Sequence, residues 1–402
     1  MSLPAAAFEL ILMVLQFIFS DSSAPDRGKS TATQPAASAP QQVAQRVAVV
    51  LFNLGGPLKP ADVRPFLFNL FNDRAILRLP RLPRWLLAQL ISRLRASKAR
   101  GIYAGLGGGS PLLANTRAQA DALQTALQAD SKAAGDTTTW QVSIAMRYWH
   151  PMTAEAVRQV QEFAPDHLVL LPLYPQFSTT TTASSVKAWR QAAARQGLNV
   201  PTTVTIGCYP AASGLIDAYA ELAAAKLAAV PAGLPVPRLL YSAHGLPEKI
   251  VQDGDPYPIQ VTLTAEAITA RLRQQYPDCA FEPRLCYQSR VGPVKWIEPS
   301  TEQEIEAAGQ AGVPLVVLPI AFVSEHSETL VELDEEYAHL AQEAGVPHYG
   351  RVPTVDSHPA FIADLASQVV QATHQANGTI VGPKICPPGA ICLCRNDPII
   401  GI

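Results

Sequence analysis

The chain has 402 residues, of which 48% are hydrophobic and 16% are charged, and its formal net charge is −2. This length favours two domains, and the low charged fraction leaves ample apolar material for a large core. A nearly neutral chain has no global attraction to nucleic acid, and no apolar run reaches the roughly 18–20 residues of a membrane span.

Residues 1–45 are expected to form an N-terminal extension, disordered and outside the folded body. The apolar run FELILMVLQFIF (8–19) is too short for a span and lacks the basic flank of a signal peptide. A segment rich in small residues and proline follows it, which is typical of linkers. We expect the extension to be dispensable, with a targeting role as the alternative.

From residue 46, short apolar runs alternate with helical patterns. Strands are predicted at 46–54, 140–148, 167–174 and 202–209, and again at 238–243, 281–287, 314–320 and 347–351. Predicted helices between them include 82–103, 153–163, 183–196, 258–276, 301–310, 326–344 and 358–375. Continuous Val/Ile/Leu strands that alternate with helices indicate parallel sheets covered on both faces.

A weak internal repeat indicates two similar halves. Residues 153–178 and 301–324 each predict a helix followed by a strand that ends in Leu-Pro. The proline-rich stretch 229–237 would join them. The sequence therefore predicts an α/β protein of two doubly wound, Rossmann-like or flavodoxin-like domains with parallel four-stranded sheets. Their expected bounds are 46–230 and 231–375, followed by a cysteine-containing tail at 376–402. Ligands of such sheets bind outside the carboxyl ends of the strands.

Unusual residues lie at two of these strand ends. His244 directly follows an apolar run, although a histidine there is more often structural. The second strand end leads into a helix with Glu325, Glu328, Glu332 and Glu336, the last three at intervals of four. Like charges at this spacing disfavour a helix by a few tenths of a kcal/mol per pair. A cation path or proton exit therefore explains the row better than a solvated helix face does.

A basic, apolar helix at 82–103 precedes the glycine-rich loop GLGGGSPL (105–112). The loop fits neither nucleotide fingerprint, so we interpret it as a tight turn that brings backbone and Ser110 close to a ligand. The leucines suit a core-facing helix. The basic excess suits a ligand with carboxylates, a membrane surface, or both.

Seven motifs together resemble one family. They are LFNLGGP, GIYAGLGGGSPL, MRYWHP, LPLYPQFS, YSAHGLPEKIVQDGDPYP, CYQSRVGPVKWIEPST and AFVSEHSETLVELDEEY. In this order and spacing the chain is similar to ferrochelatases over roughly residues 46–375. The resemblance implies insertion of ferrous iron into a porphyrin, in a cleft between the two domains.

The resemblance also implies site residues. His244 would bind metal or take a pyrrole proton, Glu328 would be the facing carboxylate and metal ligand, and His326 and Glu332 would be their catalytic neighbours. The implied substrate-binding residues are Tyr103, Ser110, Arg147, Tyr148, Tyr257 and Trp296, with Arg95, Lys98 and Ser289 at the propionates. Metalation releases two N–H protons, so a base and a proton exit are needed, and mixed imidazole and carboxylate ligands suit the metal.

Some relatives hold a [2Fe-2S] cluster through C-terminal cysteines and an internal one. Cys386, Cys392 and Cys394 match the C-terminal set, but Thr179 stands where animal relatives have cysteine. The fourth ligand would then be Cys208, Cys286 or a group other than cysteine. The alternative is a reduced tail without a cluster.

We therefore expect a ferrochelatase, a lyase of haem biosynthesis, that acts in the cytoplasm or peripherally at the inner membrane. The alternatives are another tetrapyrrole metal chelatase and a non-catalytic porphyrin or haem carrier on the same scaffold. The apolar lip and glycine-rich loop favour protoporphyrin IX over coproporphyrin III. The sequence leaves open a monomer or a homodimer, and it leaves the iron donor open.

Overall fold

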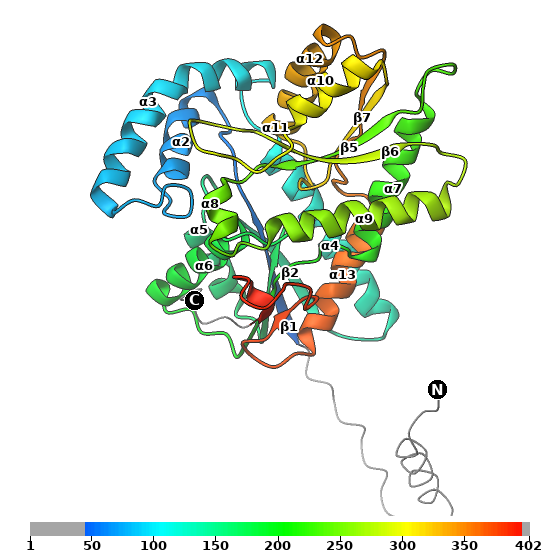
Figure 1. The fold of residues 1–402 in the computed structure, drawn as a ribbon. Coiled ribbons are helices and arrows are strands. Elements are labelled where there is room, and N and C mark those ends of the chain that lie inside the picture. The colour runs from blue at the N-terminus through cyan, green and yellow to red at the C-terminus, as the bar shows by residue number, and fades with distance from the viewer. Residues whose placement is uncertain (1–44, 396–402) are drawn as a thin grey trace, which may run out of the picture. The chain divides into compact units, whose positions relative to one another are not determined.

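Two parallel β-sheets organise the structure, a computed structural model that describes residues 45–395 (Figure 1). The expectations for residues 1–44 therefore lie outside the described part of the chain. The first sheet has the strand order β2-β1-β3-β4-β9, and the second has the order β6-β5-β7-β8. All neighbouring strands within each sheet run parallel, which confirms the predicted α/β class.

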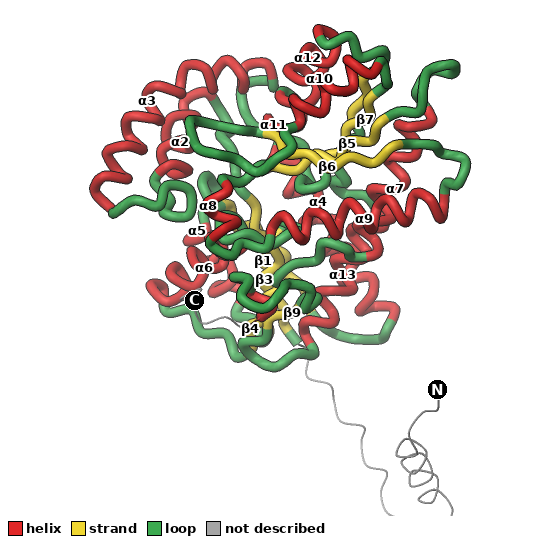
Figure 2. The backbone as a smooth tube through the Cα atoms, in the orientation of Figure 1, coloured by secondary structure: helices red, strands yellow, loops and turns green. Residues whose placement is uncertain are grey.

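The strands lie close to their predicted positions. In the first sheet they are β1 (Arg46–Asn53), β2 (Thr139–Met146), β3 (His167–Pro172), β4 (Thr202–Ile206) and β9 (Ile380–Val381). In the second they are β5 (Arg238–His244), β6 (Glu282–Gln288), β7 (Leu315–Pro319) and β8 (Tyr349–Arg351). Figure 2 shows both groups of strands lying between helices.

The helices of the first half are α2 (Val63–Phe71), α3 (Arg81–Gly105), α4 (Leu112–Ala133), α5 (Thr153–Phe163), α6 (Thr182–Gln196) and α7 (Ser213–Ala228). Those that follow are α8 (Glu248–Gln252), α9 (Tyr257–Gln275), α10 (Thr301–Ala311), α11 (Ser327–Leu330), α12 (Tyr337–Glu343) and α13 (Pro359–Thr373). Short 3₁₀ turns lie at Pro60–Asp62 and Leu393–Arg395. In the described part of the chain no helix is both long and apolar enough to cross a membrane.

Strand β1 explains why continuous apolar runs mark these sheets. Val47, Val49 and Leu51 point into one core, while alternate residues such as Val50 and Phe52 point into a second core on the opposite face. Successive side chains of a strand face opposite sides, so a sheet covered on both faces needs apolar residues throughout. The first of these cores also takes in residues of β5 and β7, and therefore packs against both sheets.

The tail adds to the first sheet a strand that was not predicted. Ile380 of β9 pairs with Thr205 of β4, so this sheet has five strands rather than the expected four. Helix α13, which the sequence assigned to the second half, contacts α7, α4, β3 and β4. The boundaries drawn at residues 230 and 375 remain predictions, but these contacts attach α13 and β9 to the five-stranded sheet.

The predicted helix at 326–344 is interrupted. It consists of α11, a π-helical stretch at Glu332–Glu336, and α12. A π-helix carries i→i+5 hydrogen bonds and is frequent at functional sites. The main-chain N–H of Glu336 accordingly donates to the carbonyl of Val331 at 2.9 Å. This insertion changes which side chains share a face, with consequences for the glutamate row.

Candidate active site

His244, His326 and Glu328 meet beyond the carboxyl ends of β5 and β7. The Nε2 atom of His244 lies 3.8 Å from Oε2 of Glu328, and Nε2 of His326 lies 3.6 Å from the same oxygen. His244 ends β5, whereas Glu328 belongs to α11, which follows β7. Because β5 and β7 are neighbours in one parallel sheet, the topology brings these two loops together.

The protonation pattern of His244 follows from its neighbour. Its Nδ1 atom lies 2.6 Å from the carbonyl oxygen of Gly245, which can only accept a hydrogen bond. Nδ1 therefore carries the ring proton, and in the neutral ring Nε2 presents a lone pair on the side of Glu328. A lone pair in this position can bind a metal ion or accept a proton.

Glu328 and His326 form a charged pair. Burial alone would raise the pKa of Glu328, but the charge of His244 and the hydrogen bond and charge of His326 lower it to about 2. Burial would likewise lower the pKa of His326, but its interactions with Glu328 raise it. Glu328 is therefore an anion throughout the neutral range and can attract a divalent cation.

Glu332 has the opposite tendency. Burial and the charge of Glu328 raise its pKa, although several donors surround it. Ser289 donates to Glu332 through its backbone N–H at 2.7 Å and its hydroxyl at 2.6 Å, and Gln288 donates through Nε2 at 3.2 Å. Two adjacent carboxyl groups with pKa values shifted in opposite directions are the usual arrangement for dividing metal-binding and proton-accepting roles.

The glutamate row is shorter than the sequence predicted. Glu325 forms an ion pair with Arg351 at 2.5 Å and accepts a hydrogen bond from the backbone N–H of Thr354. Its carboxylate therefore has a structural role. Glu336 is exposed, because the π-helical turn removes it from the face of Glu328 and Glu332. The expectation of a continuous row was wrong at both ends.

Buried polar side chains of the first half hold the loop that carries this site. Gln176 donates to the carbonyl of Ile320 at 3.1 Å. Gln119 donates to the carbonyl of Val323 at 2.8 Å, and Asn115 donates to that of Glu325 at 3.0 Å. The strand-end loop after β7 is thus fixed by donors that lie far from it in the sequence.

Three predicted pocket residues lie against this group. The Tyr103 hydroxyl of α3 hydrogen-bonds to Ser327 of α11, and the Tyr257 side chain hydrogen-bonds to the backbone of His244. The ring of Trp296 lies 6.4 Å from that of His244, and its buried Nε1 has no hydrogen-bond partner in the described structure. A buried donor without a partner suits a site completed by a ligand.

Phe322 belongs to the site but was not predicted. Its ring centre lies 6.4 Å from that of His244 and 4.6 Å from that of His326, so it packs against both histidines. The only signal was its place just after the β7 strand in the AFVSEH motif. Apolar strand-end residues do not differ in type from core residues, so the sequence could not distinguish it.

Arg147 and Tyr148 are brought together with Asp73, which the sequence did not identify. Arg147 Nη2 lies 2.7 Å from Asp73 Oδ2, and the hydroxyls of Tyr148 and Ser184 donate to the same oxygen. Burial would raise the pKa of Asp73, but the Arg147 charge and these hydrogen bonds lower it. Tyr148 is only 1% exposed, so its role as a substrate contact remains a prediction.

The remaining predicted contacts lie on and after α3. Arg95 and Lys98 are exposed on this helix, and Arg95 lies over the ring of Phe71 at 5.8 Å. Ser110 packs so tightly on Gly56 that a Cβ at that glycine would lie 2.6 Å from the Ser110 Cβ. The two glycine-rich loops thus lie in close contact, and the predicted approach of Ser110 to a ligand stays a prediction.

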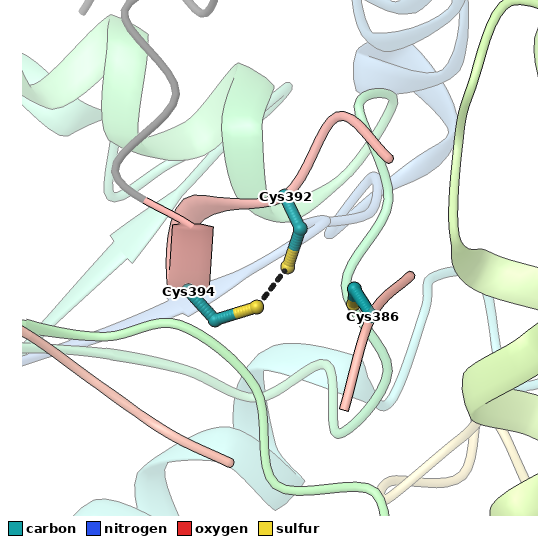
Figure 3. Close-up of side chains that lie close together, drawn as sticks. All are labelled: Cys386, Cys392 and Cys394. Atoms are coloured by element: carbon teal, nitrogen blue, oxygen red, sulfur yellow. Dashed lines mark hydrogen bonds between the residues drawn. The ribbon is translucent and has the colours of Figure 1, made fainter. Parts of the chain in front are cut away.

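Three cysteines of the tail converge, as Figure 3 shows for Cys386, Cys392 and Cys394. All are buried, and their sulfur atoms lie within 4.8 Å of one another. Cys208 is also buried and interacts with Cys392, but it does not belong to the group of three whose sulfur atoms lie this close together. Cys286 packs in a different core, beneath Thr301, and is not part of this group. Three buried thiols at one place are the ligand type of an iron–sulfur cluster or a tetrahedral metal ion, and Cys208 is the cysteine beside them.

Sequence comparisons place the chain in one family. A family model described as Ferrochelatase matches residues 46–373. A curated protein of Caulobacter vibrioides named Ferrochelatase is 52% identical over 356 residues, which is 88% of this chain and 98% of that one. One of Phenylobacterium zucineum with the same name is 50% identical over 87% and 98% of the two chains. The solved structure titled SirB from Bacillus subtilis with Fe3+ aligns with a TM-score of 0.46 at 12% identity, over 82% of this chain and 96% of that one.

Proposed function

Given that the chain belongs to the ferrochelatase family, and so inserts ferrous iron into a porphyrin in haem biosynthesis, we propose that His244 and Glu328 receive the metal. The proposal is supported by one observation: the free Nε2 of His244 lies 3.8 Å from an ionised carboxylate. Imidazole and carboxylate together suit Fe²⁺ and can replace part of its water shell. The carrier alternative is not favoured, since the matching family and relatives are enzymes by name.

Proton removal is assigned to the same group of residues. Before the metal occupies Nε2, the neutral His244 ring accepts a pyrrole proton there and passes it to Glu332, whose pKa is raised, so that the lone pair is free again for Fe²⁺. A base whose pKa is shifted toward neutrality transfers protons efficiently at physiological pH. His326 keeps Glu328 ionised while this occurs, through the interactions that lower the pKa of Glu328.

The porphyrin is placed by the surrounding residues. Tyr103, Tyr257 and Trp296 supply apolar surface to the macrocycle, with Ser110, Arg147 and Tyr148 as further contacts. Arg95 and Lys98 bind the propionate groups as charge-assisted hydrogen-bond donors, and Ser289 lies beside them. Protoporphyrin IX is the favoured substrate, because its vinyl groups match the exposed apolar face of α3.

The decisive experiment separates turnover from binding in a His244→Ala variant. Iron insertion under anaerobic conditions should fall by about 10² or more, the range of a lost general base. Porphyrin affinity, followed by fluorescence, should stay near that of the unmodified protein, because the other contacts remain. Glu328→Gln should behave in the same way, since the amide keeps the shape but neither attracts a cation nor accepts a proton.

Two results would contradict the catalytic role of His244. If His244→Ala retained turnover, the residue would have no catalytic part. A parallel loss of porphyrin affinity and melting temperature, with turnover per bound porphyrin unchanged, would make it a structural histidine. Both quantities should be measured on the same folded sample.

We further propose that Cys208, Cys386, Cys392 and Cys394 hold a [2Fe-2S] cluster. The support is the convergence of the three tail thiols and the interaction of Cys208 with Cys392, together with the resemblance of the tail pattern to cluster-binding relatives. Such a cluster supplies one-electron redox chemistry when bound, and its thiolate ligands would tie the tail to the first sheet.

A peripheral membrane contact through α3 is proposed as well. Leucines 82, 86, 90 and 94 of this helix are between 53% and 71% exposed, and Trp85 is 44% exposed. Arginines at 81, 84, 93 and 95 lie among them on the same helix. An exposed apolar stripe flanked by basic groups suits an anionic lipid surface of the cytoplasmic leaflet, from which a poorly soluble porphyrin could enter.

A further inference from the structure

A single buried amide faces the cysteine group. Gln260 of α9 is fully buried, and its Nε2 lies 3.2 Å from the Cys386 sulfur and 3.9 Å from the Cys392 sulfur. Its Oε1 accepts a hydrogen bond from the backbone N–H of Phe177 at 2.8 Å. Both ends of this side chain are therefore accounted for.

The orientation of the amide is determined by its surroundings. The backbone N–H of Phe177 can only donate, so the carbonyl end of Gln260 must face it. The NH₂ end must then face the sulfurs. A protonated thiol is a weak acceptor, whereas a thiolate is a strong one. The buried donor is thus better matched to cysteines that have lost their protons to a metal than to free thiols.

We propose that Gln260 is the positioning residue of the cysteine centre, donating N–H···S hydrogen bonds that stabilise its metal-bound thiolates. This inference rests on the proposed centre and assigns to it a residue outside the cysteine motif. Donors around a metal site commonly alter its affinity by 10- to 100-fold, and hydrogen bonds to sulfur help to set cluster potentials.

A second contact ties the same tail to the start of α9. The backbone N–H of Ile391 donates to the carbonyl of Gly254 at 2.8 Å. A Cβ at Gly254 would lie 3.3 Å from both the Gly389 carbonyl oxygen and a side-chain carbon of Ile391. Gly254 also has φ of +103°, so only glycine fits there without strain. The tail is therefore held both by the turn that precedes α9 and by Gln260 of α9.

The test is a Co²⁺ titration of the metal-free full-length protein, read by the thiolate-to-cobalt charge-transfer absorption. The His–Glu site has no thiolate and does not contribute to that band. Gln260→Leu should weaken Co²⁺ binding by about 10-fold. Gln260→Glu should weaken it more, because a carboxylate oxygen would then face the thiolates.

Gln176→Leu is the matched control. Gln176 is a buried amide that donates to Thr264 of the same helix, and no contact joins it to sulfur in the described structure. Its loss should leave the Co²⁺ affinity within about 2-fold of the unmodified protein, whatever the change in melting temperature.

Each outcome can be distinguished. The unmodified protein should show a thiolate-to-cobalt band, and Cys392→Ser should remove it. If either result fails, the cysteine centre itself is wrong and so is this inference. If the band is present but both Gln260 variants bind Co²⁺ as the unmodified protein does, the centre stands and the role of Gln260 is wrong. An equal loss in Gln260→Leu and Gln176→Leu would likewise overturn it.

Discussion

Neighbouring charges give the carboxyl groups near His244 different tasks. Glu328 is held as an anion by two histidines, Glu332 is disposed to take up a proton, and Glu325 is paired with Arg351. The sequence could identify the residue types but not this division, because it depends on partners such as Ser289 and Arg351 that lie far along the chain. The residue types of the site and their approximate positions were predictable, whereas the direction in which each carboxyl group's pKa is shifted was not.

Asp356 provides a pH-dependent test of these charges. Burial and the neighbouring Glu325 raise its pKa to about 6, well above the value of an unfolded aspartate. A raised pKa means that the folded state prefers the protonated form, so ionisation costs stability as pH rises through this range. Asp356→Asn should therefore stabilise the protein by about 1–2 kcal/mol at pH 7.5, after allowance for solvent screening.

The gain should be much smaller at pH 4, where the carboxyl group is protonated in the folded state and about half protonated in the unfolded state. Asparagine also tolerates the φ of +38° at this position. Urea unfolding at the two pH values measures the difference. A gain of the same size at both would show that charge is not the cause.

The propionate contacts can be tested through kinetics. Arg95→Leu and Lys98→Leu should raise the apparent KM for porphyrin more than they lower kcat, because contacts to remote carboxylates act alike in ground and transition states. Arg100→Leu, on the same helix and also exposed, is the matched control. A selective loss of kcat would instead assign Arg95 or Lys98 to the chemistry.

At the scale of elements, the regular parts of the fold were readable and the irregular parts were not. Strands β1 and β5 could be identified in the sequence from their runs of apolar residues. The π-helical turn at Glu332–Glu336 could not be foreseen, because glutamates spaced by four resemble an ordinary helix. The two-residue strand β9 is too short to give any periodic signal.

Helix α3 gives a prediction about membranes. The double variant Leu86→Asp/Leu90→Asp should bind vesicles of anionic phospholipid at least 10-fold more weakly, since each leucine contributes about 1.5–2 kcal/mol when buried in lipid. Folding should be unaffected, because both side chains are more than half exposed. Co-sedimentation with vesicles measures binding.

Val236→Asp supplies the control for this surface. Val236 is 54% exposed but lies in the proline-rich link before β5, away from α3 in the sequence. Its substitution should leave vesicle binding unchanged. Equal losses in both variants would point to non-specific adsorption rather than to docking through α3.

At the scale of the whole molecule, the cysteine centre joins distant parts of the chain. We expect the purified protein to be brown, with [2Fe-2S] absorption, and Cys208→Ser and Cys392→Ser to bleach it. Cys286→Ser should leave the colour intact, because Cys286 lies in a separate core. Colourless protein with all thiols free after anaerobic purification would show that the cluster proposal is wrong. Bleaching by Cys286→Ser and not by Cys208→Ser would show that Cys286 is the fourth ligand.

The place of β9 in the first sheet has a consequence for synthesis. The backbone N–H of Thr203 in β4 donates a hydrogen bond to the side chain of Asn377, which lies 174 residues later in the chain. During synthesis, domains generally fold from the N-terminal end. The edge of β4 that pairs with β9 therefore stays unpaired until nearly all of the described chain has been made. An unpaired strand edge is a template for aggregation. A chain truncated after residue 375 would lack β9 and leave β4 unpaired on that side, and we expect it to aggregate more readily than the full chain.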